Sequence, residues 1–89
     1  MRLAQVSGDS MLPTLTDGDF VLFDTSKCDL RDGKIMVIGI DNYLYIKRVR
    51  VSPEGIFLVS DNKSVYEPWR IIPETTRFLG LVIWHCGDV

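Results

Sequence analysis

Two apolar runs separated by only two polar residues constrain the fold of this chain more than any other feature. The runs cover residues 34–40 and 43–51, and Asp41 and Asn42 lie between them. Both of these residues tolerate a positive φ, which a two-residue hairpin turn requires. The pattern therefore predicts a β-hairpin whose second strand is the longest in the chain.

Further short apolar runs extend the strand pattern in both directions. A run at residues 19–23 follows Gly18, another at 55–59 follows a Ser-Pro-Glu-Gly turn, and a last one covers 79–85. Proline presets its own φ and glycine closes such a turn, so the third and fourth strands also read as a hairpin.

The rest of the chain shows little sign of helix. Residues 12–15 are long enough for one helical turn, residues 61–76 look irregular, and no segment has a sustained helical period. We therefore expect a mainly β protein, formed by residues 1–89 as a single domain. Regular turn spacing favours a compact, twisted, antiparallel β architecture with little helix.

Composition and charge narrow the classes of function. The chain has 89 residues, of which 46% are hydrophobic and 25% charged, as in globular proteins. Its net charge of -2 lacks the basic footprint of a nucleic-acid-binding domain. The longest apolar runs, 35–38 and 81–84, are far shorter than the ~20 residues of a membrane-spanning helix. With no secretion leader visible, we expect a cytoplasmic protein that makes no membrane contact.

The two cysteines do not form a disulfide framework. Cys28 and Cys86 are expected to be free thiols in a reducing compartment. The only histidine, His85, adjoins Cys86, and neighbours in a strand point to opposite faces. A Cys–His nucleophile is therefore not expected, nor is a metal or cofactor.

Lys47 lies inside the longest apolar strand. Alternation along the strand places it on one face with Tyr45 and Val49, and places Arg48 and Arg50 on the other face, toward solvent. Burial disfavours a charged ammonium and lowers its pKa, and a neutral lysine can accept the proton of a serine hydroxyl. A lysine can also pack its stem and keep its head in water, and the strand alone leaves both interpretations open.

Ser10 lies in a polar segment ahead of the first of these strands. Gly8 allows the backbone to bend there and lets another segment approach closely. Amides at the start of a helical turn can face a developing oxyanion, and those of Asp9 and Ser10 are the candidates. The alternative is an ordinary polar loop in which Ser10 caps a turn at residues 12–15. A serine and a buried lysine together suffice for nucleophilic catalysis without histidine.

Several short motifs, in this order along the chain, resemble those of the LexA and phage-repressor peptidases. The matching segments are Ser10-Met11-x-Pro13-Thr14-Leu15 with Asp17-Gly18-Asp19, Ile46-Lys47-Arg48-Val49, Val59-Ser60-Asp61-Asn62 with Tyr66-Glu67-Pro68, and Gly80-Leu81-Val82-Ile83-Trp84. Each motif alone is weak evidence for the family. Together, in this order, they are specific to it and span nearly the whole chain. The resemblance implies the LexA C-terminal fold, which signal peptidases share.

The resemblance also implies roles for the matched residues. Ser10 would be the nucleophile, and Lys47, in its neutral form, the general base and later the proton donor. Other residues would shape the site or order its loop: Gly8, Met11, Pro13, Asp61 and Asn62. Asp61 and Asn62 have an equally good alternative as an Asx-type turn that ends a strand.

Peptidases of this family usually cut their own chain in a linker that precedes the serine, at an Ala-Gly or Cys-Gly bond. No such pair precedes Ser10 in this sequence. The family implies that a RecA filament stimulates cleavage during the SOS response, and that cleavage separates a DNA-binding half from a dimerising half. We therefore expect the C-terminal domain of a LexA-like or prophage repressor, with a DNA-binding domain upstream of this chain.

Other functions remain open on the sequence. The domain could be a catalytically silent module that holds a repressor homodimer together, since its last strand is apolar on both faces and would pair with a partner near a sheet edge. Dimer symmetry would then match a palindromic operator. A UmuD-like protein and a soluble relative of signal peptidases are further alternatives. In the signal-peptidase comparison, Ser60 replaces a glycine of the Gly-Asp-Asn segment.

Overall fold

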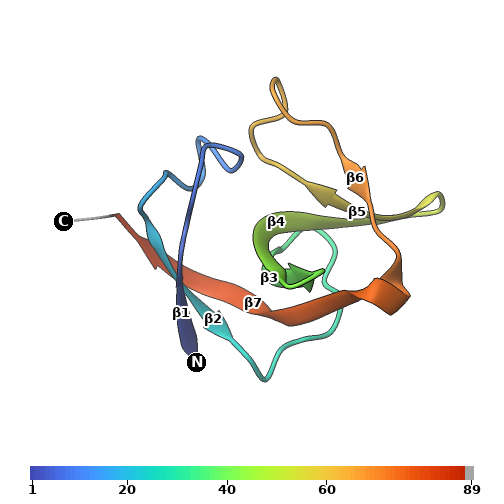
Figure 1. The fold of residues 1–89 in the computed structure, drawn as a ribbon, viewed down its shortest axis with the longest axis horizontal. Helices are drawn as coiled ribbons and strands as arrows, with labels where there is room; N and C mark the ends of the chain where they lie inside the picture. Colours follow the sequence, from blue (N-terminus) through green and yellow to red (C-terminus); the bar gives the residue numbers. More distant parts are fainter. Residues whose placement is uncertain (88–89) are drawn as a thin grey trace.

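The computed structural model describes residues 1–87, and nearly all of its regular structure is one antiparallel sheet. The strands lie in the order β1-β2-β7-β3-β4-β5-β6. β7 crosses the width of the domain and joins the β1–β2 side to the β3–β6 side (Figure 1). The elements are β1 (Arg2–Gln5), β2 (Phe20–Asp24), β3 (Ile35–Ile40), β4 (Tyr43–Ser52), β5 (Gly55–Val59), β6 (Trp69–Arg70), the 3₁₀ turn η1 (Pro73–Thr75) and β7 (Thr76–Cys86). The expected mainly β fold with little helix is confirmed.

Both predicted hairpins are present. Asp41 and Asn42, with φ of 51° and 69°, connect β3 to β4, so that Ile40 pairs with Tyr43. Left-handed conformations at both positions match the twist of the strands, which explains why Asp and Asn are found there. β4 returns into β5 through the Ser52–Gly55 pair.

β3 separates two hydrophobic cores. Its side chains alternate between the faces of the sheet, and Met36, Val37 and Ile38 are all fully buried. On one face Val37 packs with the first cluster, and on the other Met36 and Ile38 pack with the second. The first cluster also contains Val6, Met11, Leu15, Val21 and Phe23, and the second Val49, Leu58 and Ile71. The segment that carries Ser10 therefore belongs to the first core.

The structure adds elements that the sequence pattern did not predict. β1 is short and mostly exposed, and it forms by pairing with β2. β6 and η1 lie in the segment expected to be irregular, and β7 begins at Thr76 instead of Leu79. At residues 12–15, where the sequence allowed one short turn of helix, a single helix-like hydrogen bond forms, from the Leu15 amide to the Met11 carbonyl (2.9 Å), and the turn does not extend into a helix.

Within the described part of the chain, no helix has the length and apolar character needed to cross a bilayer. Cys28 and Cys86 are both unpaired, as expected.

Candidate active site

The loop that carries Ser10 is closed at its base by backbone hydrogen bonds. The Val6 amide donates to the Asp19 carbonyl (2.8 Å), and the Gly18 amide donates to the Val6 carbonyl (2.9 Å). Gly8 and Gly18 have φ of 88° and 91°, which glycine adopts without steric cost. The Gly8 amide donates to the Asp17 carboxylate (2.7 Å), so the Gly and Asp residues that flank Ser10 fix the path of its loop.

The apolar side chains of this loop anchor it to the first core. Met11 is 1% exposed and Leu15 is completely buried. Met11 follows Ser10 directly and also lines the cavity described below, which is the position expected for a packing residue beside the nucleophile. Pro13 follows a cis peptide bond in the same turn.

The segment after β5 holds the other side of the Ser10 loop. The Asn62 backbone amide donates to the Ser10 carbonyl (3.0 Å), and its side-chain amide donates to the Asp9 carbonyl (3.1 Å). The Tyr66 hydroxyl donates to the Asp9 carboxylate (2.6 Å), and this bond raises the pKa of Tyr66. Segments more than fifty residues apart in sequence thus meet at Ser10, and Asn62 joins them through its backbone and side-chain amides.

Asp61 ties the same segment to β4 and to the Ser10 loop. Its carboxylate accepts two hydrogen bonds from the Arg48 guanidinium (2.9 and 2.8 Å) and one from the Thr14 hydroxyl (2.5 Å). Arg48 also donates to the Gly33 carbonyl (2.8 Å). The bonds from Arg48 lower the pKa of Asp61, whose side chain is 9% exposed, and raise the pKa of Arg48.

This pairing corrects one expectation from the sequence. Arg48 does not extend freely into solvent, because the nearly buried carboxylate of Asp61 binds its guanidinium through two charge-assisted hydrogen bonds. Arg50 does lie at the surface, where it faces the exposed carboxylate of Asp32 at 3.6 Å. Strand alternation correctly separated these arginines from Lys47, but it could not reveal a partner that lies in a later loop.

The Lys47 side chain is half-buried, and its amine is hydrogen-bonded at the site. Its Nζ donates to the Ser60 hydroxyl at 2.8 Å, and Ser60 is only 4% exposed. The Tyr66 ring covers the amine, with its centroid 5.4 Å from Nζ. Desolvation by this burial lowers the pKa of Lys47 below its ordinary value of 10.5. The amine is thus hydrogen-bonded and partly desolvated, and its role as a base stays a prediction.

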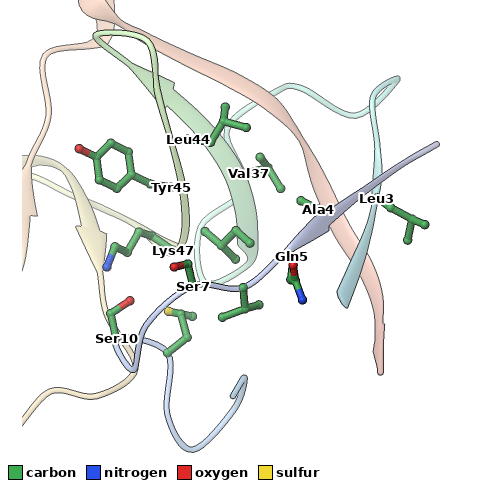
Figure 2. A pocket seen from close by; sticks show the side chains of 12 residues that line it. Leu3, Ala4, Gln5, Ser7, Ser10, Val37, Leu44, Tyr45 and Lys47 are labelled. Atoms are coloured by element: carbon green, nitrogen blue, oxygen red, sulfur yellow. The ribbon is translucent and has the colours of Figure 1, made fainter. Parts of the chain in front are cut away.

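Ser10 and Lys47 line the same cavity. It has a volume of about 310 Å³ and is bounded by β1, β3, β4 and the Ser10 loop. The side chains of Ser10 and Lys47 point toward the same end of this cavity (Figure 2). Apolar side chains, among them Val6, Val37 and Leu44, form much of the remaining wall.

Two unpaired strand edges flank the cavity. β1 is an edge strand of the sheet, and the half of β4 that precedes Arg48 has no partner on its β5 side within residues 1–87. Both segments contribute residues to the cavity wall. Unpaired edges present backbone amides and carbonyls, which an extended peptide can satisfy by adding as a strand. The site can thus receive an extended polypeptide next to a serine and a lysine.

Comparison with known proteins agrees with this geometry. Residues 1–83 match the family described as Peptidase S24-like. The chain belongs to this family. It is 34% identical over 83 residues to an "HTH-type transcriptional regulator" of Haemophilus influenzae, covering 91% of this chain and 35% of that protein. It is 41% identical over 63 residues to LexA repressor 1 of Xanthomonas oryzae pv. oryzae, covering 70% of this chain and 31% of that protein. It is 29% identical over 79 residues to repressor protein CI of phage phi80, covering 89% of this chain and 34% of that protein.

The S24-like chain spans about a third of the length of these curated relatives. The match to the family covers every residue discussed at the site, from Gly8 to Tyr66. The expected resemblance to LexA and phage repressors is thereby confirmed, and the β architecture agrees with that of a LexA-like S24 domain.

The expected oxyanion site of the S24-like domain stays a prediction. The Asp9 and Ser10 amides make no hydrogen bond to protein groups within residues 1–87, so both remain available to a ligand. They do not begin a helix, however, and the Asp9 carbonyl instead accepts from the Leu12 amide in a tight turn (3.2 Å). Any oxyanion stabilisation must come from the two amides themselves and not from a helix dipole.

Ser60 and Tyr66 both contact Lys47, and the sequence interpretation missed both contacts. In the β4–β5 hairpin Ser52 pairs with Gly55 and Arg48 with Val59, so the same register places Ser60 opposite Lys47. Continuing the predicted hairpin by one residue would have revealed the contact. Tyr66 offered no such signal, because it lies in an irregular segment that reaches the site only through tertiary contacts.

Proposed function

We propose that this S24-like domain is the C-terminal part of a transcriptional repressor and a Ser–Lys peptidase that cuts its own chain upstream. One observation carries the peptidase proposal: a half-buried Lys47, with a pKa lowered by partial desolvation, lines the cavity that also contains Ser10. A lowered pKa makes the neutral amine more accessible, and a neutral amine is the base that an unactivated serine needs. The relatives' printed names, a LexA repressor and a phage repressor, support the regulatory half of the proposal.

The chemistry follows ordinary acyl transfer. Neutral Lys47 takes the proton of Ser10 as Oγ attacks the scissile carbonyl carbon, and the free Asp9 and Ser10 amides face the resulting oxyanion. The Lys47 ammonium then gives that proton to the departing amine, which leaves an ester on Ser10. Water, deprotonated by the same amine, hydrolyses the ester and restores the serine. Each proton that Lys47 accepts is returned within the cycle, so no cofactor is required.

The proposed substrate is a linker that precedes this domain in the longer protein. An extended segment could enter between the free edges of β1 and β4 and present its backbone to Ser10. Cutting there would separate this domain from a DNA-binding domain upstream. This chain has a net charge of -2, so we assign DNA binding to that other domain. A RecA filament as the activator remains a prediction of the family resemblance.

The longer protein tests this proposal. Incubated at pH ~10, where lysine is increasingly neutral, wild type should convert to two fragments, which mass spectrometry can locate. The Ser10→Ala variant should stay intact under the same conditions. An intact wild-type protein, or equal cleavage of the Ser10→Ala variant, would contradict the proposal.

A second role, dimerisation, is supported by exposed apolar side chains on β2 and β7. Phe20, Ile83 and Trp84 are 36%, 43% and 52% exposed. The sequence suggested that the last strand lies near a sheet edge. β7 instead lies between β2 and β3. Among residues 1–87, its last residues, 82–86, nevertheless pair with β2 alone and leave their other edge unpaired.

Sedimentation equilibrium tests the dimer. Wild type should have twice the monomer mass, and Trp84→Asp should shift the protein toward monomer because it places a charge in an apolar contact. The exposed Val65→Asp substitution serves as the control, since Val65 lies in a different segment. A monomeric wild type at all accessible concentrations would contradict this role.

A further inference from the structure

We propose that Ser60 is a positioning residue, which accepts an N–H of the Lys47 amine and thereby directs the lone pair of the neutral amine toward Ser10. This inference rests on the proposed peptidase function. It assigns Ser60 a task that neither the motifs nor the family match attaches to this position.

The geometry carries the proposal. Ser60 is 4% exposed, and its Oγ lies 2.8 Å from the Lys47 Nζ, in hydrogen-bond range. Its backbone is fixed on both sides, because Val59 pairs with Arg48 in the sheet and Asp61 is bound by the Arg48 guanidinium. The acceptor is therefore held rigidly, opposite a side chain that has four flexible methylene groups.

A general base needs this kind of support. A neutral amine has two N–H donors and a single lone pair, so fixing one N–H toward Ser60 limits the directions that the lone pair can take. Without an acceptor the lysine stem, which has about 2 kcal/mol of rotamer entropy, would sample other directions. Misplacement of a reacting group by about 1 Å can lower a rate by ~10²-fold.

The same hydrogen bond also affects the pKa of Lys47. The groups in contact with the amine are the Ser60 hydroxyl and the Tyr66 ring. The carboxylates of Asp9 and Asp61 are bound to the Tyr66 hydroxyl and to the Arg48 guanidinium. The Ser60 oxygen stabilises the charged ammonium, so its loss should lower the Lys47 pKa further. Removing Ser60 would then increase the fraction of neutral base while lowering the reaction rate. A purely structural role would not produce these opposite changes together.

Reaction of Ser10 with a fluorophosphonate, followed by mass spectrometry from pH ~7 to ~10, tests the inference on this chain. The reagent forms an Oγ–P bond at the serine, fluoride leaves, and the serine proton passes to Lys47. For Ser60→Ala we expect a plateau rate about 10- to 100-fold below wild type and an inflection at lower pH. Ser60→Thr, which keeps the hydroxyl, should restore most of the rate.

The matched control is Ser52→Ala. Ser52 is a half-buried serine in the same hairpin, and its hydroxyl donates to the Gly55 carbonyl at 3.3 Å, away from the site. This variant should react like wild type. If Ser60→Ala does not fold, Ser60→Cys, with its weaker acceptor, should give an intermediate rate with the same direction of pH shift.

Three outcomes would overturn the inference. If Ser60→Ala reacts like wild type, Ser60 has no positioning role, although the peptidase proposal stands. If Ser60→Thr reacts as slowly as Ser60→Ala, and the pH of the inflection in the rate profile matches wild type for both variants, then Ser60 affects the rate only through packing. If wild-type Ser10 does not react at any pH, the peptidase proposal fails and the inference fails with it.

Discussion

Replacing Lys47 with alanine should lower the rate of self-cleavage of the longer protein by about 10²- to 10⁴-fold, the usual contribution of a general base. Lys47 is the one basic side chain among the described residues that line the cavity containing Ser10. The rate is measured from loss of the intact chain with time. Lys34→Ala, which removes an exposed lysine, should cleave like wild type.

The pH dependence of the cleavage rate follows from the direction in which the Lys47 pKa is shifted. Desolvation places the folded-state pKa below 10.5, so the cleavage rate should rise as pH increases through that lowered value and then level off. The folded state binds this proton less readily than the unfolded chain. Lys47 therefore reduces the free energy of unfolding at neutral pH, and this cost disappears as pH rises through the folded pKa toward 10.5.

Because charged Lys47 lowers the free energy of unfolding, a substitution that removes the charge can abolish cleavage without destabilising the fold. Lys47→Met, which keeps the stem without the charge, should abolish the pH-dependent cleavage while leaving the unfolding midpoint in urea unchanged or higher. A Lys47→Met protein that cleaves like wild type would show that another group is the base. A rate that stays flat across the alkaline range would also contradict the account.

Replacing Asp61 with alanine should lower the free energy of unfolding by about 2–3 kcal/mol. The substitution removes a nearly buried carboxylate and leaves Arg48 and the Thr14 hydroxyl without their partner. Hydrogen bonds to charged groups contribute about 1.5–3 kcal/mol, and an orphaned buried charge is costly. Urea denaturation measures the change. Asp29→Ala, which breaks the exposed pair with Arg31, should have a clearly smaller effect.

Acid titration checks the same network. Because Arg48 and Thr14 lower the pKa of Asp61, its stabilising contribution is fully present above the unfolded value of 3.8 and is lost as pH falls through the lower folded pKa. The stability difference between wild type and Asp61→Ala should therefore be constant near neutrality and shrink at strongly acid pH. A difference that grows on acidification would show that the pairing is misassigned.

Much of the fold was predictable because it depends on local signals. Asp41 and Asn42 identify a hairpin through their tolerance of positive φ, and apolar alternation locates β3, β4, β5 and the end of β7. β1 and β6 were not predictable in this way. They are short strands with mostly exposed residues, and they exist because a longer neighbour offers backbone hydrogen bonds.

The site was predictable to the extent that it lies on strands or in recognisable motifs. Alternation placed Lys47 on a partly apolar face, and the motif around Ser10 indicated the nucleophile. The ion pair of Arg48 with Asp61 and the contact of Tyr66 with Asp9 were not predictable from local pattern, since they join segments that only the tertiary fold brings together. Ser60 lies between these cases, because hairpin register alone places it opposite Lys47.

The central claim is that Lys47 activates Ser10, and the most direct test is the fluorophosphonate reaction of this chain at alkaline pH, with the modified residue located by mass spectrometry. The account predicts that wild type is modified at Ser10 alone. It also predicts that Lys47→Ala reacts at least about 10²-fold more slowly under the same conditions. Equal reactivity of the two proteins, or modification at a serine other than Ser10, would contradict it.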